Sequence, residues 1–268
     1  MKILDIYSKE NLNLITFRGV DIITLMDRFF TKFPSSYREN YDKNMENLEI
    51  YRVDEMMDID DFASYVPELN VLLFSFEKSL PHELMHMSSA NLEKKLFAFC
   101  KAGQRTLWEN GLLEGMTEYL GCMATNTAPK TYFFEYFVVS MLSSIDNIFE
   151  PYFIPSYDGL ISLFPNKRDI CSLMYGLDFY HDKSQTIDKN TSKEEINRIR
   201  SSIKGVIDSL IDIELSFDND FNKKKLYVDK FMDLIMDCNV DMILKDIYPE
   251  YADYAFYEIN KRVLRRSR

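Results

Sequence analysis

The stretch Asn70-Val71-Leu72-Leu73-Phe74-Ser75-Phe76 is followed, after two residues, by Ser79-Leu80-Pro81-His82-Glu83-Leu84-Met85-His86-Met87. The first stretch is almost entirely apolar, which is typical of a strand buried in a sheet. Ser79 is a common residue at the N-cap of a helix, and Pro81 suits the first helical turn, so the second stretch predicts a helix over Leu80–Met87. The pair therefore indicates a strand, a short turn and a helix.

The predicted helix carries His82-Glu83-Leu84-Met85-His86, which is an H-E-x-x-H motif. Side chains four residues apart lie on one face of a helix, so both imidazoles can reach a single ion, and zinc is an ion that imidazole nitrogen binds well. Glu83 then lies near enough to act as a base on a water molecule at the metal. The chain has only 3 histidines, and the presence of two in this motif favours a site with one zinc per chain over an ordinary polar helix face.

A second acidic motif follows in Gly111-Leu112-Leu113-Glu114-Gly115-Met116-Thr117-Glu118-Tyr119-Leu120. Glu114 is our predicted third protein ligand of the zinc ion. Glu118, one helical turn later, can accept a hydrogen bond from the far nitrogen of a ligating histidine and so orient it. Glu109 and Glu118 remain alternative candidates for the third ligand.

With these two motifs, residues Asn70 to Leu120 resemble the gluzincin group of zinc metallopeptidases, in which a glutamate from a second helix completes the H-E-x-x-H site. The second motif is similar to the Gly-Leu-Asn-Glu-Gly-x-Thr-Glu-Tyr-Leu segment of bacterial zinc peptidases. Leu113 stands where those sequences often have asparagine. The 27 residues between His86 and Glu114 require an additional segment between the two helices. We expect a strand over Leu96–Cys100 and a turn over Lys101–Gln104 within it.

The resemblance implies a peptidase that hydrolyses peptide bonds of a peptide or protein substrate by Glu83-assisted activation of water. It also implies a distal histidine or tyrosine that donates a hydrogen bond to the tetrahedral oxyanion. His181 is the remaining histidine and the candidate catalytic residue for this role, although it falls in the segment His181–Lys193, which we predict to be a surface loop. A loop histidine without a role remains an alternative. The competing tyrosine donors are Tyr119, Tyr132, Tyr175 and Tyr180.

Two other classes of function remain open. One is a non-catalytic zinc-binding or interaction protein, against which the presence of Glu83 argues, since zinc binding alone needs no base. The other is a helical structural protein in which the motif is fortuitous. Metal content distinguishes the last class from the others.

The rest of the chain indicates an α+β fold, with a mixed α/β portion over residues 1–125 and a mainly helical portion over residues 126–268. In the first portion, Leu14–Phe17 and Ile50–Val53 are prone to form strands, and Ile22–Phe30 is helix-like. Glycine is scarce after Thr131, which favours packed helices there. The helices expected in the second portion are Tyr132–Phe149, Arg168–Tyr180, Lys193–Ser216, Phe221–Cys238 and Tyr251–Leu264.

The composition limits the partners. With 43 acidic and 32 basic side chains, the formal net charge is -11, which disfavours nucleic acids and anionic membranes. The C-terminal basic residues are expected to form a solvated helix end; they are Lys261, Arg262, Arg265, Arg266 and Arg268.

Neither a signal peptide nor a transmembrane segment is expected from the sequence. The four cysteines show no CxxC spacing and fit free, buried thiols in a reducing compartment. They are Cys100, Cys122, Cys171 and Cys238. These patterns predict a cytoplasmic protein.

Overall fold

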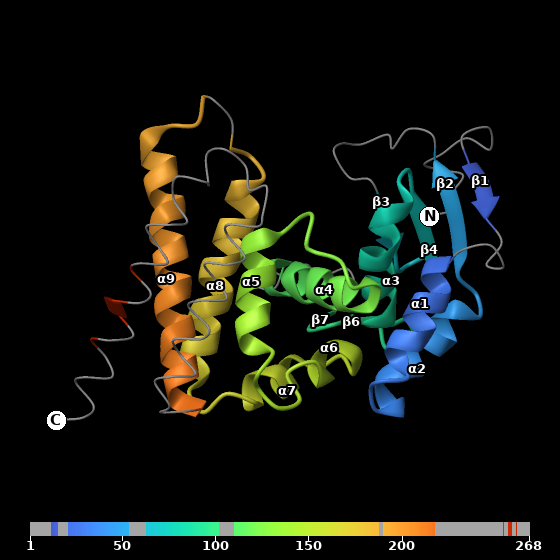
Figure 1. Ribbon diagram of the computed structural model, residues 1–268, viewed down its shortest axis with the longest axis horizontal. Helices are drawn as coiled ribbons and strands as arrows, with labels where there is room; N and C mark the ends of the chain where they lie inside the picture. Colours follow the sequence, from blue (N-terminus) through green and yellow to red (C-terminus); the bar gives the residue numbers. More distant parts are fainter. Residues whose placement is uncertain are drawn as a thin grey trace. The chain divides into compact units, whose positions relative to one another are not determined.

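The computed structural model describes residues 12–15, 21–53, 63–101, 110–187 and 190–217, together with Tyr254, Tyr257, Glu258 and Lys261. Within these residues the predicted α+β fold is confirmed: strands and helices are mixed up to Lys101, and helices alone follow from Asn110 onward (Figure 1). The chain divides into two compact units. The first unit comprises Met1–Arg105, Thr117–Ala128 and Phe149–Tyr157, and the second comprises Thr106–Met116, Pro129–Ile148 and Asp158–Arg268. The sequence-based boundary between residues 125 and 126 stays a prediction.

The first unit contains a sheet of four strands in the order β1-β2-β4-β3. These strands are β1 (Leu12–Ile15), β2 (Glu49–Val53), β4 (Val71–Phe74) and β3 (Ala63–Val66). β2 and β4 run parallel, whereas the outer strands β1 and β3 run antiparallel to their neighbours. All four residues of β4 are buried, as its apolar sequence predicts, and β3 lies at the edge of the sheet.

Helix α3 (Leu80–Ser88) follows β4 after a 3-10 turn over Glu77–Ser79 and matches the predicted helix. Pro81 lies in its first turn as expected. Ser79 is the N-cap residue as expected, but its backbone is already helical and its side chain makes no capping hydrogen bond. The 3-10 turn that precedes α3 therefore replaces a side-chain cap.

A sheet of three short strands follows α3: β5 (Ala90–Asn91), β6 (Leu96–Phe97) and β7 (Cys100–Lys101). The prediction of one strand over Leu96–Cys100 was wrong in this detail. Ala98 has a positive φ of 46°, and its N–H donates to the Ser89 carbonyl at 2.9 Å. The chain turns at Ala98 and Phe99, so β6 and β7 pair antiparallel.

Helices α1 (Asp21–Phe30), α2 (Ser35–Met45) and α6 (Glu150–Phe153) build an aromatic core in the first unit. Phe153 lies 5.5 Å from Phe30 and 5.4 Å from Tyr37, measured between ring centroids. Asn40 also donates to the Phe153 carbonyl at 2.9 Å. These contacts hold α6 against α1 and α2 although more than a hundred residues separate the segments.

Helix α4 (Asn110–Thr125) runs through both units. The second unit further contains α5 (Phe133–Leu142), α7 (Tyr157–Ser162), α8 (Lys167–Ser184) and α9 (Lys193–Phe217). α8 and α9 lie side by side, as Figure 1 shows. The predicted helix Lys193–Ser216 is confirmed. The expected helix Tyr132–Phe149 is wrong beyond Leu142, where turns replace it before α6.

The remaining predictions have mixed outcomes. Phe221–Cys238 lies outside the described residues, whereas Tyr254, Tyr257, Glu258 and Lys261 are helical. Cys122 is a buried free thiol as expected, but Cys171 is exposed. No helix within the described ranges is long and apolar enough to cross a membrane.

Candidate metal centre

His82 and His86 present their Nε2 atoms to the same point from one face of α3. The two Nε2 atoms lie 3.1 Å apart, and the ring planes are inclined by 74° with centroids 4.8 Å apart. His86 is buried, and His82 is partly exposed. The spacing of four residues thus produces the convergence that the sequence predicts, with the His82 ring partly exposed and the His86 ring buried.

Glu114 in α4 joins the two histidines. One ligand atom from each of His82, His86 and Glu114 lies within 4.8 Å of the others, and among the residues that the structure describes this is the one such group of three. Two imidazole nitrogens and a carboxylate oxygen form a donor set that zinc accepts, and a fourth position would remain for water or substrate. Of the alternative ligands, Glu118 contacts a histidine instead, and Glu109 lies outside the described residues.

Glu118 contacts the ring of His82. Its Oε2 atom lies 2.9 Å from His82 Nδ1, and Glu118 is only 7% exposed. Its Oε1 atom accepts from the Cys122 thiol at 3.7 Å. A carboxylate at this position favours the tautomer with the proton on Nδ1, which leaves Nε2 as the metal-binding nitrogen.

Glu83 is held by the edge strand β3. Its Oε2 atom accepts the backbone N–H of Tyr65 at 2.7 Å, and the side chain is 8% exposed. In an antiparallel pair of strands, the backbone N–H and C=O groups of every second residue point away from the partner strand. The hydrogen bond to Glu83 shows that the N–H of Tyr65 points away from β4. Glu83 is therefore anchored beside the outer edge of the sheet, one residue after His82.

His181 lies in α8 rather than in the predicted surface loop, which begins only after the helix ends at Ser184. It is buried, with 8% of its surface exposed. Its Nδ1 atom lies 2.9 Å from Glu135 Oε1 in α5, and its Nε2 atom lies 3.1 Å from Gln185 Nε2. The loop prediction failed because the residues that follow His181 in the sequence are polar. The partner that stabilises a buried histidine at this position, Glu135, lies in another helix.

The surroundings of His181 favour its protonated form. Burial alone would lower its pKa, but the hydrogen bond to Glu135 and the charge of that carboxylate outweigh burial, and the charges of Glu114 and Asp182 add to them. The pKa of His181 is therefore raised above the ordinary value. Glu114 thus influences His181 electrostatically within the second unit.

The four tyrosines considered as oxyanion donors have different surroundings. Tyr132 lies beside His181, with ring centroids 5.4 Å apart. Tyr119 stacks on Phe149, with centroids 5.7 Å apart, and Tyr180 is buried. The ring of Tyr132 thus lies against the candidate catalytic histidine.

Gly115 allows α4 to pass close to α5 next to Glu114. A Cβ atom added at Gly115 would lie 2.6 Å from the Glu135 carbonyl oxygen and 2.7 Å from its carbon. Backbone atoms cannot yield to such a contact as a flexible side chain can. The glycine therefore permits the close approach that places Glu135, the partner of His181, against the helix that carries Glu114.

Thr117 and Tyr152 are polar residues near the histidines that the sequence did not single out. Thr117 Oγ1 lies 3.4 Å from His86 Nδ1 and 2.9 Å from Tyr152 Oη. Thr117 belongs to the second acidic motif, and the similar peptidase segment also has threonine there, which was the available signal. No local pattern pointed to Tyr152.

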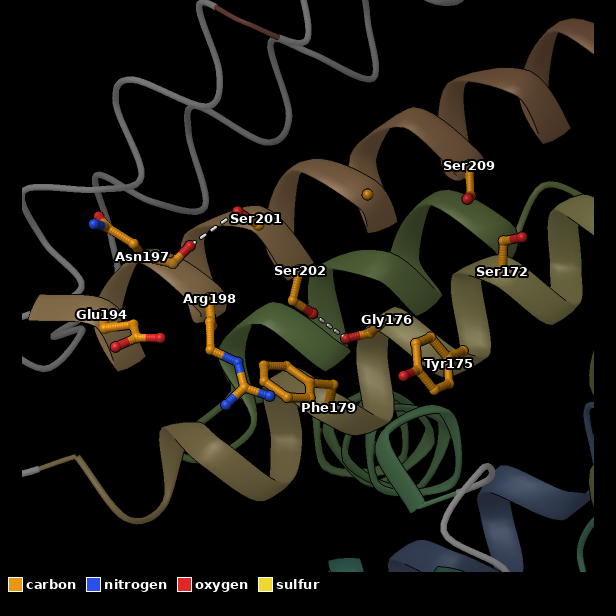
Figure 2. A pocket seen from close by; sticks show the side chains of 11 residues that line it. Ser172, Tyr175, Gly176, Phe179, Glu194, Asn197, Arg198, Ser201, Ser202 and Ser209 are labelled. Atoms are coloured by element: carbon orange, nitrogen blue, oxygen red, sulfur yellow. Dashed lines mark hydrogen bonds between the residues drawn. The ribbon is translucent and has the colours of Figure 1, made fainter. Parts of the chain in front are cut away.

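A separate groove of about 810 Å³ lies between α8 and α9 of the second unit (Figure 2). Tyr175 and Phe179 line it from α8, and the Arg198 guanidinium lies 5.3 Å from the Phe179 ring centroid. Ser202 donates a hydrogen bond to the Gly176 carbonyl and so joins the two helices along the groove (Figure 2). Tyr175 apart, none of the candidate site residues lines this groove.

Comparisons of the chain with family models, with curated proteins and with solved structures find no match.

Proposed function

We propose that the chain is a zinc-dependent peptidase of the gluzincin type, with His82, His86 and Glu114 as metal ligands and Glu83 as the general base. The observation that carries this proposal is the convergence of the three ligand atoms within 4.8 Å of one another. The order of the motifs supports it as well, because one helix provides two histidines and a second helix provides the glutamate.

The charges of the site favour a divalent cation. Buried carboxylates are stable only when they are paired or coordinate a metal. Glu83 and Glu118 are each less than a tenth exposed, and Glu114 adds a third carboxylate at the histidines. A zinc ion would offset part of this negative charge, and its donor preference matches two nitrogens and one oxygen better than that of calcium or magnesium.

When bound, zinc supplies a Lewis acid that lowers the pKa of a water molecule and polarises a carbonyl group. Glu83 accepts the proton of the attacking water and passes it to the leaving amine. The hydrogen bond from the Tyr65 N–H holds the Glu83 carboxylate in place through its Oε2 atom. His181 is the proposed hydrogen-bond donor to the oxyanion. Its Nδ1 atom contacts Glu135, so its Nε2 atom would donate and would have to leave its contact with Gln185; its raised pKa suits a donor.

The class of substrate follows from two features. The similarity of Asn70 to Leu120 to gluzincin segments supports a peptide bond as the bond that is cleaved. The position of β3 at the edge of the described sheet supports it as well, because an extended peptide can pair with an edge strand; this pairing would use outward backbone groups other than the Tyr65 N–H, which donates to Glu83. Since Glu83 is anchored to this strand, a peptide bound there would pass the general base.

Replacement of Glu83 by glutamine tests the proposal. Glu83→Gln keeps the shape of the side chain but removes the base, so zinc should remain bound while turnover falls by about 10²–10⁴-fold. The assay uses a broad peptide library with zinc-loaded wild-type protein, and the loss should appear in kcat rather than in KM. Wild-type turnover by zinc-loaded Glu83→Gln protein would contradict the mechanism. Zinc binding without cleavage of any library peptide would instead support the non-catalytic zinc-binding alternative.

A further inference from the structure

The Nδ1 atom of His86 faces a buried pair of hydroxyl groups. Thr117 Oγ1 lies 3.4 Å from this nitrogen, and the same oxygen lies 2.9 Å from Tyr152 Oη. Thr117 and Tyr152 are both 0% exposed. His86, Thr117 and Tyr152 all belong to the first unit, so this chain of polar groups lies within one compact body.

The two histidines therefore differ in the groups that hold their far nitrogens. A carboxylate contacts Nδ1 of His82 at 2.9 Å, whereas a neutral hydroxyl group contacts Nδ1 of His86. When Nε2 of a neutral imidazole binds a metal ion, the proton of the ring must reside on Nδ1, which then needs an acceptor. Thr117, which contacts this nitrogen, is 0% exposed, and His86 itself is only 8% exposed.

We infer that Thr117, held by the hydroxyl group of Tyr152, is a positioning residue that fixes the orientation and tautomer of His86. The bond of 2.9 Å to Tyr152 fixes the Thr117 side chain, so that its oxygen remains within reach of Nδ1. A second carboxylate at this place would add negative charge to a buried region that already holds Glu83 and Glu118. The hydroxyl pair provides an acceptor without that charge. The inference rests on the proposed function, since it assumes that His86 binds zinc through Nε2.

The affinity for zinc tests this inference in four variants. Thr117→Val keeps the branched shape and removes the hydroxyl group, Thr117→Ser restores it, and Tyr152→Phe removes only the distal oxygen. Tyr41→Phe is the matched control, because Tyr41 is also buried in the first unit, at 1% exposure, and packs on Phe30 with ring centroids 4.7 Å apart. The dissociation constant of zinc is measured by competition with a chelator, and the melting temperature is measured on metal-free protein.

We expect Thr117→Val to weaken zinc binding by about 10–100-fold, which is the usual effect of losing a partner of a ligating histidine. Tyr152→Phe should weaken binding in the same direction by a smaller factor, whereas Thr117→Ser and Tyr41→Phe should bind zinc as the wild type does. ¹⁵N chemical shifts of zinc-loaded protein provide a second measurement. They should report a proton on Nδ1 of His86 in the wild type and a perturbed His86, but not His82, in Thr117→Val.

Equal zinc affinity of wild type and Thr117→Val would overturn the inference, and so would an equal loss in Tyr41→Phe. If Thr117→Val does not fold, the zinc affinity of Tyr152→Phe is compared with those of the wild type and Tyr41→Phe, and an unchanged affinity would overturn the inference. A wild-type protein that binds no zinc would overturn both this inference and the proposed function. Zinc binding that depends on Thr117 in a protein without peptidase activity would contradict the proposed activity alone, because the ranking of affinities requires no turnover.

Discussion

His82 Nδ1 and Glu118 Oε2 are 2.9 Å apart, and the two side chains are only 13% and 9% exposed. The contact engages Glu118 with the ring of a histidine, whereas Glu114, one turn earlier in α4, belongs to the group of candidate ligands. We therefore predict that Glu118→Ala weakens zinc affinity by about 10–100-fold and that Glu114→Ala weakens it further. Chelator competition on both variants checks the order. A larger loss in Glu118→Ala would require the two roles to be exchanged.

The paired histidines predict one zinc ion per chain. Elemental analysis of protein purified without added metal should find it, and the double variant His82→Ala/His86→Ala should lose nearly all of it, because the remaining carboxylate cannot hold zinc alone. His181→Ala is the matched control, since it removes a buried histidine that is not a candidate ligand. Stoichiometric zinc in the double variant would rule out the assigned ligands.

The pair of His181 and Glu135 predicts a pH-dependent contribution to stability. Because the pKa of His181 is raised above 6.5 in the folded chain, protonation stabilises the fold. The contribution is fully present below about pH 6.5 and is lost as the pH rises through the folded-state pKa. Glu135→Gln removes the charge, so the pKa of His181 should fall, which an NMR titration measures.

Unfolding in denaturant completes this test. The stability difference between wild type and Glu135→Gln should be larger at acidic pH and should shrink as the pH rises. Asp182→Asn is the control, because Asp182 is the weakest of the causes that raise this pKa, and its effect should be smaller. An unchanged His181 pKa in Glu135→Gln would contradict the ion pair.

Gly115 and Gly121, two of the glycines in α4, are expected to respond differently to replacement by alanine. A methyl group at Gly115 would lie 2.6 Å from a backbone oxygen, whereas at Gly121 the nearest atoms lie at 3.5 Å, an ordinary contact. Gly115→Ala should destabilise the fold by about 1–3 kcal/mol through overpacking. Gly121→Ala should be neutral or should stabilise it by up to about 1 kcal/mol, because alanine favours helix. Thermal unfolding of both metal-free variants measures the difference, and equal effects would contradict the close approach at Gly115.

Elements with a strong local pattern were predictable from the sequence. The apolar run around Val71–Phe74 and the helix over Lys193–Ser216 are examples. Helix α2 was missed because its buried face consists of Tyr37, Asn40, Tyr41 and Asn44, which hydrophobic patterns weigh lightly. Asn44 is buried there because its amide donates to the carbonyl groups of Met87 and Ala90, at 2.9 Å and 2.7 Å. Such long-range acceptors are invisible in the sequence.

The candidate site divides in the same way. His82 and His86 were found because a helix brings residues four positions apart to one face, and Glu114 was found by similarity of a motif. The hydroxyl of Tyr152 and the carboxylate of Glu135 acquire their importance only from partners 35 and 46 residues away. No periodicity within one helix records such a pairing.

The long-range contacts around α3 also bear on how the protein folds. His82 meets Glu118 across 36 residues, His86 meets Thr117 across 31, and Thr117 meets Tyr152 across 35. An unfolded chain therefore offers zinc little more than the local pair of histidines, since the loops that bring their partners must close first. If zinc binds tightly only to the complete site, it would stabilise the native state rather than the transition state of folding. It would then slow unfolding more than it accelerates folding. A chelator would then shorten the lifetime of the folded protein while leaving the rate of folding nearly unchanged.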